Sequence, residues 1–134
     1  MTSAAHAIAD FLNKQGVASI GATTGWALAI SREPENPPNV VTVYDTGGDD
    51  FDTGELDITT YSVQVRVRAV EYFDATNKIN EVIRLIKRAA FTFQNLRFIS
   101  VRAVGGLNHI GFDDNDRTLI TTNFECLVQL EENI

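Results

Sequence analysis

A cluster of carboxylates is the first feature of this sequence that could do chemistry. Residues 44–57 read YDTGGDDFDTGELD and contain three glycines but no Lys or Arg. The six acidic residues of this acidic segment are Asp45, Asp49, Asp50, Asp52, Glu55 and Asp57. Carboxylates in such number occur in metal cages, in pairs of catalytic acids, and in solvated surface loops. The spacing of the acids helps to separate these interpretations.

The spacing does not fit a calcium site of the helix-loop-helix type. Such a site needs Gly at its sixth position and Glu at its twelfth. Counting from Asp50 places Tyr61 at the twelfth position, and counting from Asp45 places Asp50 where Gly is required. An irregular, weak ion site stays open, but a solvated and flexible loop is the simpler interpretation.

The rest of the sequence contains no pattern that is typical of a catalytic site. A hydrolytic pair needs two carboxylates held about 5–9 Å apart by rigid elements, which a Gly-rich loop does not provide. The only cysteine, Cys126, alternates inward on a predicted strand and is interpreted as a small buried hydrophobe. His6 and His109 lack zinc spacing, and no Gly-rich phosphate motif occurs. The sequence therefore predicts no enzyme and no bound metal or cofactor.

Composition limits the class of protein. The 134 residues are enough for one domain, 1–134. Eighteen acidic residues against eleven basic ones give a net charge of −7, which argues against nonspecific binding of nucleic acid. No apolar run approaches the roughly 20 residues that span a bilayer, so no membrane contact is expected.

Hydrophobic periodicity predicts two helices, at Thr2–Gln15 and Asp74–Phe91, with Ser3 or Thr2 and Asp74 as N-caps. The predicted strands are Trp26–Ser31, Val40–Tyr44, Ile58–Val70, Asn95–Val104 and Thr118–Leu130. Irregular connections are expected at 17–25, at Pro34–Pro38, across the acidic segment and at Gly105–Arg117. This order predicts an α+β fold: a mostly antiparallel or mixed sheet of four to five strands, both helices on one face, and long protruding loops.

Charge is divided unevenly along the chain. Residues 59–112 carry eight basic residues and three acidic ones, whereas the acidic segment before them is uniformly negative. Arg66 and Arg68 alternate with the apolar residues of a predicted strand, so we expect them on its polar face. Such a face is either an ordinary wet surface or a subunit contact that complements the acidic segment of another copy.

A second candidate loop lies late in the chain, within Gly105–Arg117. Its polar residues are Asn108, His109, Asp113, Asp114, Asp116 and Arg117. His109 is interpreted as a donor that orders the loop, with contact to a partner as the alternative.

Several stretches of the sequence together resemble one protein family. They are PPNVVTVYDTGG, YSVQVRVRAVEYFDATNKINEVIRLIK, the glycine-containing GGLNHIGFDDNDR and the strand-like TNFEC. In their order and local character these stretches are similar to the tail terminator, or minor capsid, proteins of long-tailed bacteriophages. The resemblance covers roughly Ala5 to Leu130.

The resemblance implies a structural virion protein assembled in the bacterial host cytoplasm. It implies a homo-oligomeric ring, commonly of six copies, that caps the tail tube, stops its polymerisation and offers a surface to the head-completion or connector protein. Genome DNA would pass through the ring without specific binding. The acidic segment would then either line the opening, where carboxylates repel phosphates, or dock against a neighbouring ring.

Two other functions stay open at this point. The first is a head-completion protein at the connector, which differs in its position in the particle. The second is a small ion- or ligand-binding domain built on the acidic segment.

Overall fold

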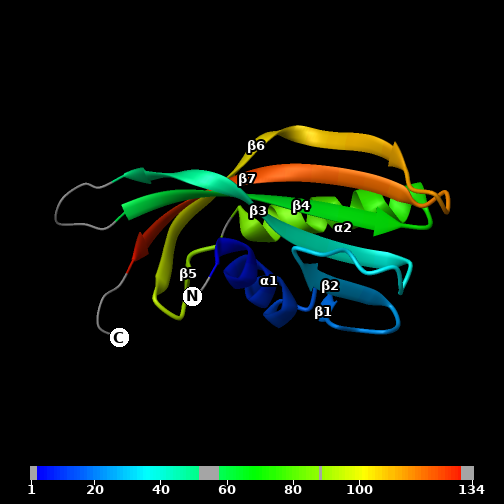
Figure 1. The fold of residues 1–134 in the computed structure, drawn as a ribbon, viewed down its shortest axis with the longest axis horizontal. Coiled ribbons are helices and arrows are strands. Elements are labelled where there is room, and N and C mark those ends of the chain that lie inside the picture. Colours follow the sequence, from blue (N-terminus) through cyan, green and yellow to red (C-terminus); the bar gives the residue numbers. More distant parts are fainter. Residues whose placement is uncertain (1–2, 52–57, 88, 131–134) are drawn as a thin grey trace.

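The computed structural model describes residues 3–51, 58–87 and 89–130, and it has an α+β fold (Figure 1). The helices are α1 (Ala4–Lys14) and α2 (Tyr72–Ile86). The strands are β1 (Ser19–Ile20), β2 (Trp26–Ile30), β3 (Asn39–Phe51), β4 (Ile58–Ala69), β5 (Phe91–Phe93), β6 (Leu96–Phe112) and β7 (Thr118–Leu130). They form one sheet in the order β1-β2-β3-β4-β7-β6-β5.

The sheet has seven strands in the described residues and is mixed, whereas the sequence predicted four to five. From β3 onwards all neighbours are antiparallel, but β1, β2 and β3 are parallel to one another. The two additional strands are short. β1 lies in the stretch expected to be irregular, and β5 lies where α2 was expected to end.

The core lies where the alternation of β4 predicted it. Val63, Val65, Val67 and Ala69 are fully buried, and they share one hydrophobic cluster with Ile8 and Leu12 of α1 and Ile79 and Val82 of α2. Burying a Val, Leu or Ile side chain contributes roughly 1.5–3 kcal/mol, so this alternating face is a main source of stability.

The ends of the helices follow from their caps. The Ser3 hydroxyl accepts a hydrogen bond from the His6 N–H at 3.0 Å, so α1 begins where a capping residue was predicted. For α2 the predicted cap, Asp74, is wrong. The helix begins at Tyr72 after Glu71, and Asp74 lies in its first turn, where a carboxylate still favours the helix dipole.

The end of α2 also differs from the prediction. The helix stops at Ile86, and Phe91 lies in β5 with its ring stacked between those of Phe11 and Phe98, at centroid distances of 4.8 and 4.5 Å. Aromatic packing of this kind contributes about 0.5–1.5 kcal/mol beyond area burial and outweighs local helix propensity.

Two strands continue into segments that were expected to be loops. β3 runs on through Phe51 and pairs with β4 as far as Ile58. β6 runs through Gly105 to Phe112 and pairs with β7, so only residues 113–117 form the turn. Both strands contain register shifts, one at Asp45/Gly47 and three in β6, and such bulges let a strand absorb glycines without ending.

Candidate functional site

The segment that connects β2 to β3 poses a structural problem. The two strands are parallel, so residues 31–38 must carry the chain back across the length of β2. This return is shorter than the dozen or more residues usual for a parallel crossover. It contains all three prolines, and its carbonyl groups lie outside the regular strand ladder. Buried carbonyls need other partners.

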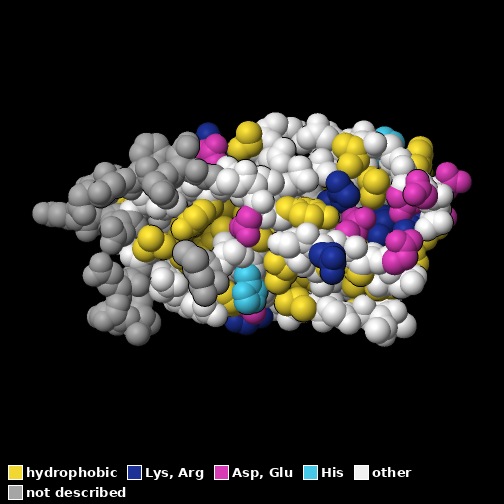
Figure 2. All heavy atoms as spheres, viewed as in Figure 1, with side chains coloured by type: hydrophobic (Ala, Val, Ile, Leu, Met, Phe, Trp, Pro, Cys, Tyr) yellow, Lys and Arg dark blue, Asp and Glu magenta, His cyan; other side chains and the backbone are white. Residues whose placement is uncertain are grey.

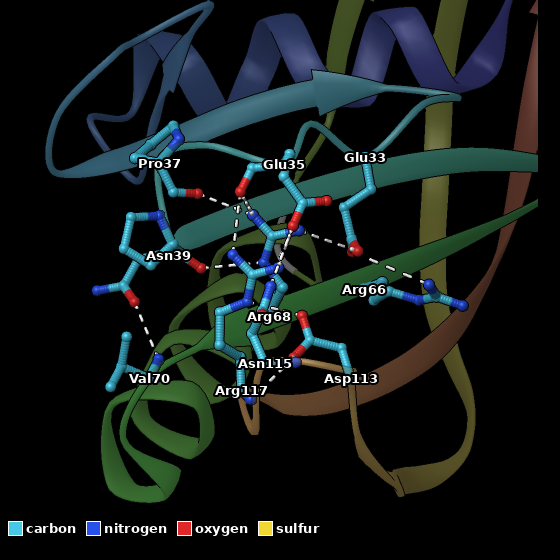
Figure 3. Close-up of polar contacts among 11 residues, drawn as sticks. Glu33, Glu35, Pro37, Asn39, Arg66, Arg68, Val70, Asp113, Asn115 and Arg117 are labelled. Carbon is cyan, nitrogen blue, oxygen red and sulfur yellow. Dashed lines mark hydrogen bonds and ion pairs between the residues drawn. The ribbon is translucent and has the colours of Figure 1, made fainter.

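Arg68 supplies hydrogen-bond donors to these carbonyl groups (Figure 3). Its Nη2 donates to the carbonyl oxygens of Pro37 at 2.8 Å and Glu35 at 3.3 Å, and its Nε donates to that of Pro38 at 3.0 Å. Its Nη1 lies 3.2 Å from Glu33 Oε1. The side chain is only 2% exposed. The expectation that Arg68 lies on a wet face is therefore wrong, because the return segment covers this part of the sheet.

Arg117 binds the same segment. Its Nη1 donates to the Glu35 carbonyl oxygen at 3.0 Å, and its Nη2 lies 3.2 Å from Glu35 Oε1. Its Nε donates to Asp113 Oδ2 at 2.7 Å, which closes the β6–β7 turn. An arginine of β4 and an arginine of the β6–β7 turn thus bind one irregular segment. We call Glu33, Glu35, Arg66, Arg68, Asp113 and Arg117 the arginine cluster (Figure 3).

The carboxylate of Asp113 is held in the cluster by three hydrogen bonds. Desolvation by burial raises its pKa, but hydrogen bonds from the Arg117 backbone N–H, the Arg117 side chain and the Asn115 backbone N–H together outweigh it. The pKa of Asp113 therefore lies below its usual value. Asp114 and Asp116 lie exposed in the same turn. Of the acids predicted in this second loop, only Asp113 joins the cluster.

Arg66 is the more accessible arginine of β4. Its guanidinium lies 5.7 Å from the centre of the Tyr44 ring, its Nη1 is 3.9 Å from Glu33 Oε2, and its side chain is 30% exposed. Burial raises the pKa of the Tyr44 hydroxyl, although the Arg66 charge opposes this shift. Arg66 therefore keeps the surface position that was predicted for both arginines.

Part of the acidic segment lies in β3, and part of it lies outside the described residues. Asp45 is exposed, and its Oδ1 accepts a hydrogen bond from the Ala5 N–H at 2.9 Å, so it caps α1 from outside that helix. The backbones of Asp49 and Asp50 lie in β3 opposite Thr60 and Thr59, which corrects the expectation of a loop there. Asp52, Glu55 and Asp57 lie outside the described residues.

An exposed aromatic patch occupies the end of the molecule that carries the β6–β7 turn. It consists of Tyr72, Phe73, His109 and Phe112. Phe73 and Phe112 are 75% and 62% exposed, and the His109 ring packs edge-on against both Tyr72 and Phe112. Figure 2 shows acidic side chains beside Lys or Arg side chains at this end, with hydrophobic ones around them. His109 and Asn108 lie in β6, opposite Ile120 and Thr121, and not in a loop.

The described residues offer little for metal or thiol chemistry. Within residues 3–51, 58–87 and 89–130, no group of three or more His, Cys, Asp or Glu side chains is placed to hold a metal ion. Burial, followed by the charges of Asp45 and Glu125, raises the pKa of the buried Cys126 thiol to about 12. None of the helices in these ranges is long and apolar enough to cross a membrane.

Sequence reasoning missed the cluster formed by Arg68 and Arg117. Two features of the sequence could have indicated it. Arg68 lies near the end of a strand whose other face is apolar, and the Pro-rich segment contains Glu33 and Glu35, which can pair with an arginine. These features do not specify which strand the segment will cover, because the parallel pairing of β2 and β3 is not visible in the pattern.

Comparison with known proteins gives a similar solved structure, no curated relative and one family match. The solved structure titled "Virion of native gene transfer agent (GTA) particle" contains a similar fold, with a TM-score of 0.53 and 14% identity, over 75% of this chain and 78% of that one. A search among curated protein sequences found no match. A family model described as "Bacteriophage tail terminator protein" matches residues 11–130, which is most of the chain. The chain therefore belongs to the bacteriophage tail terminator family.

Proposed function

We propose that this protein forms a closed ring, of six copies as the sequence resemblance implies, that caps the tail tube. The ring stops polymerisation of the tube and offers its other side to the head-completion protein. The observation that carries the proposal is the family match over residues 11–130. The described residues are consistent with a structural role, since their buried charges serve to fold the chain.

The two ends of the subunit suit contacts with different neighbours. The hairpin of β3 and β4 projects at one end, and the β6–β7 turn with the aromatic patch lies at the other (Figure 1). Exposed aromatic side chains on a small protein are typical of protein interfaces. We assign the aromatic patch to contact with an adjoining protein of the tail or connector, because Asp114 and Asp116 lie exposed in the β6–β7 turn and would repel nucleic acid.

The acidic segment supports passage of DNA without binding. Asp45 is exposed at the base of the projecting hairpin, and the identities of Asp49 and Asp50 make this strand negative. A negatively charged opening repels phosphates over about a Debye length, roughly 8 Å at physiological ionic strength. This placement of the segment near the DNA path is part of the proposal, with docking to a neighbouring ring as its alternative.

The two predicted contact arginines take different roles in this proposal. Arg66 remains a candidate for direct contact with another subunit, because its side chain is partly exposed. Arg68 is buried, so it supports assembly by fixing residues 33–38 that lie over it. Charge reversal at Arg66 should therefore weaken assembly with the subunit folded, whereas reversal at Arg68 should unfold it.

The test is the oligomeric state of the purified chain, alone and mixed with the tail tube protein encoded with it. Light scattering after size exclusion should show a closed oligomer of defined mass at high concentration or on addition of tubes. A chain that stays monomeric under both conditions would contradict the proposal.

A further inference from the structure

The sheet ends in two long strand edges that face no other strand of the described chain. β6 pairs with β7 along its length, but β5 reaches it only as far as Phe98. Residues 99–112 therefore form a free edge. On the opposite side β2 reaches β3 only as far as Val43, so residues 44–51 of β3 form a second one (Figure 1). A free edge presents backbone N–H and C=O groups to any strand that approaches.

The β6 edge is neither shortened nor covered by another described strand, although it carries bulges and an exposed arginine. Proteins commonly shorten such edges or cover them, because an exposed edge recruits other strands. Residues 100–104 pair with residues 123–127 of β7 without a register shift. This part of β6 is therefore a regular strand. Val104, at the end of this stretch, is 41% exposed, and Ile99, in the bulge before it, is 39% exposed. A regular edge of this length fits a further β-strand.

The two edges lie at the same level of the strand ladder. Gly47 is paired with Ser62, Ser62 with Glu125, and Glu125 with Arg102, so one row of partners crosses the sheet from edge to edge. The neighbouring row joins Gly48 to Val101 in the same way. If the β6 edge of one copy meets the β3 edge of the next at this level, the two copies lie side by side and are hardly displaced along the strand direction. Contacts of this kind can close into a ring, whereas displaced ones give open helices.

Strand direction and charge both fit a contact between unlike edges. Three antiparallel steps separate β3 from β6, so the two edge strands run in opposite directions. When copies stand side by side with the same orientation, β6 of one therefore meets β3 of the next antiparallel. The β6 edge carries exposed Arg102, and the β3 edge carries exposed Asp45. Opposite charges across strands favour this pairing, and like charges oppose pairing of two identical edges.

We propose that a second copy of this chain adds its β3 edge, residues 44–51, to the β6 edge of the first, mainly at residues 100–104, so that the sheet continues from copy to copy. This interface rests on the proposed ring and identifies the strands that would build it. Each copy contributes β3, β4, β7 and β6 to the continuous sheet. β1, β2, β5 and the helices are not needed for the pairing.

Cross-linking of engineered cysteines tests this proposal directly. Thr46 on β3 and Ser100, Arg102 and Val104 on β6 are exposed, so each accepts cysteine with little effect on folding. The native Cys126 is buried and its high pKa leaves it protonated, which keeps it silent toward maleimides. Thr46→Cys chains would be mixed in turn with each β6 variant and treated with a short bis-maleimide. Thermal unfolding of each variant confirms that it is folded.

We expect a covalent dimer from at least one of the three mixtures and none from either variant of that pair alone. A control mixture of Thr46→Cys with Asn80→Cys, an exposed position on α2, should give no dimer. If the wild-type chain forms a closed oligomer by light scattering but no β6 mixture cross-links, this interface is overturned and the ring stands. If the wild-type chain is monomeric even with tail tubes, the proposed function fails first and the interface with it.

Discussion

The guanidinium of Arg68 donates its Nη2–H to the carbonyl oxygen of Pro37 at 2.8 Å, from a side chain that is 2% exposed. This bond joins the middle of the sheet to the short return between two parallel strands. An arginine that the sequence pattern places on the polar face of β4 is thereby an internal support of the fold. Its partners are mainly backbone carbonyls, so the arrangement depends on the path of the chain and less on the acids nearby.

Removal of Arg68 should cost much of the stability of the subunit. Arg68→Ala leaves the Pro37 and Pro38 carbonyls and Glu33 without their buried partner, and loss of one member of such a buried group costs about 3–5 kcal/mol. The free energy of unfolding in urea measures the effect. Arg102→Ala is the matched control, because that side chain is 74% exposed and its ion pair with Glu125 should contribute about 0–1 kcal/mol. Equal losses in the two variants would refute the role given to Arg68.

Asp113 should make stability depend on acid pH. Its folded pKa lies below the ordinary value of 3.8, so its contribution is present above about pH 3.8 and is lost as the pH falls through the folded pKa. Asp113→Asn should therefore be less stable than wild type at pH 7 and should approach it in strong acid. Asp114→Asn, at the exposed neighbour, is the control and should lose little stability at pH 7. Parallel urea titrations of the three proteins across the acid range measure this, and a constant gap between Asp113→Asn and wild type would contradict it.

Cys126 should make the stability of the subunit decrease as the pH rises into the alkaline range. Burial raises the pKa of its thiol from 9.0 to about 12, so the unfolded chain loses the proton first. Stability from this group is complete below pH 9 and falls by about 1.4 kcal/mol per pH unit between the two pKa values. Cys126→Ala should show a correspondingly shallower decline of the unfolding free energy above pH 9. Parallel slopes for the two proteins would show that the thiol is not shielded.

The aromatic patch should matter for docking and not for folding. Phe73→Asp and Phe112→Asp change side chains that are 75% and 62% exposed, so the unfolding free energy should shift by no more than about 0.5 kcal/mol. Binding to an adjoining tail or connector protein should fall by tenfold or more if either residue anchors that contact. Co-sedimentation with assembled tail tubes measures one partner, and Thr92→Asp, at an exposed position on β5, is the control. Normal binding by both patch variants to tubes and to the head-completion protein would remove the patch from the docking surface.

Much of the fold follows from local patterns in the sequence. The alternation of valines in β4 and the apolar stripe of α2 identify the core, and Ser3 identifies the start of α1. The extensions of β3 and β6 do not follow, because glycines and aspartates have low β propensity and are held in these strands by pairing with β4 and β7. The burial of Arg68 does not follow either, since it depends on a parallel return that local periodicity cannot reveal.

The most direct test of the central claim is electron microscopy of tail tubes assembled with and without this protein. We expect tubes of limited length with a ring of this protein at one end, and unlimited growth of the tubes without it. Arg66→Glu should give fewer capped ends while the subunit remains folded. Tubes that grow equally long in both preparations, with no protein at their ends, would contradict a tail-capping ring.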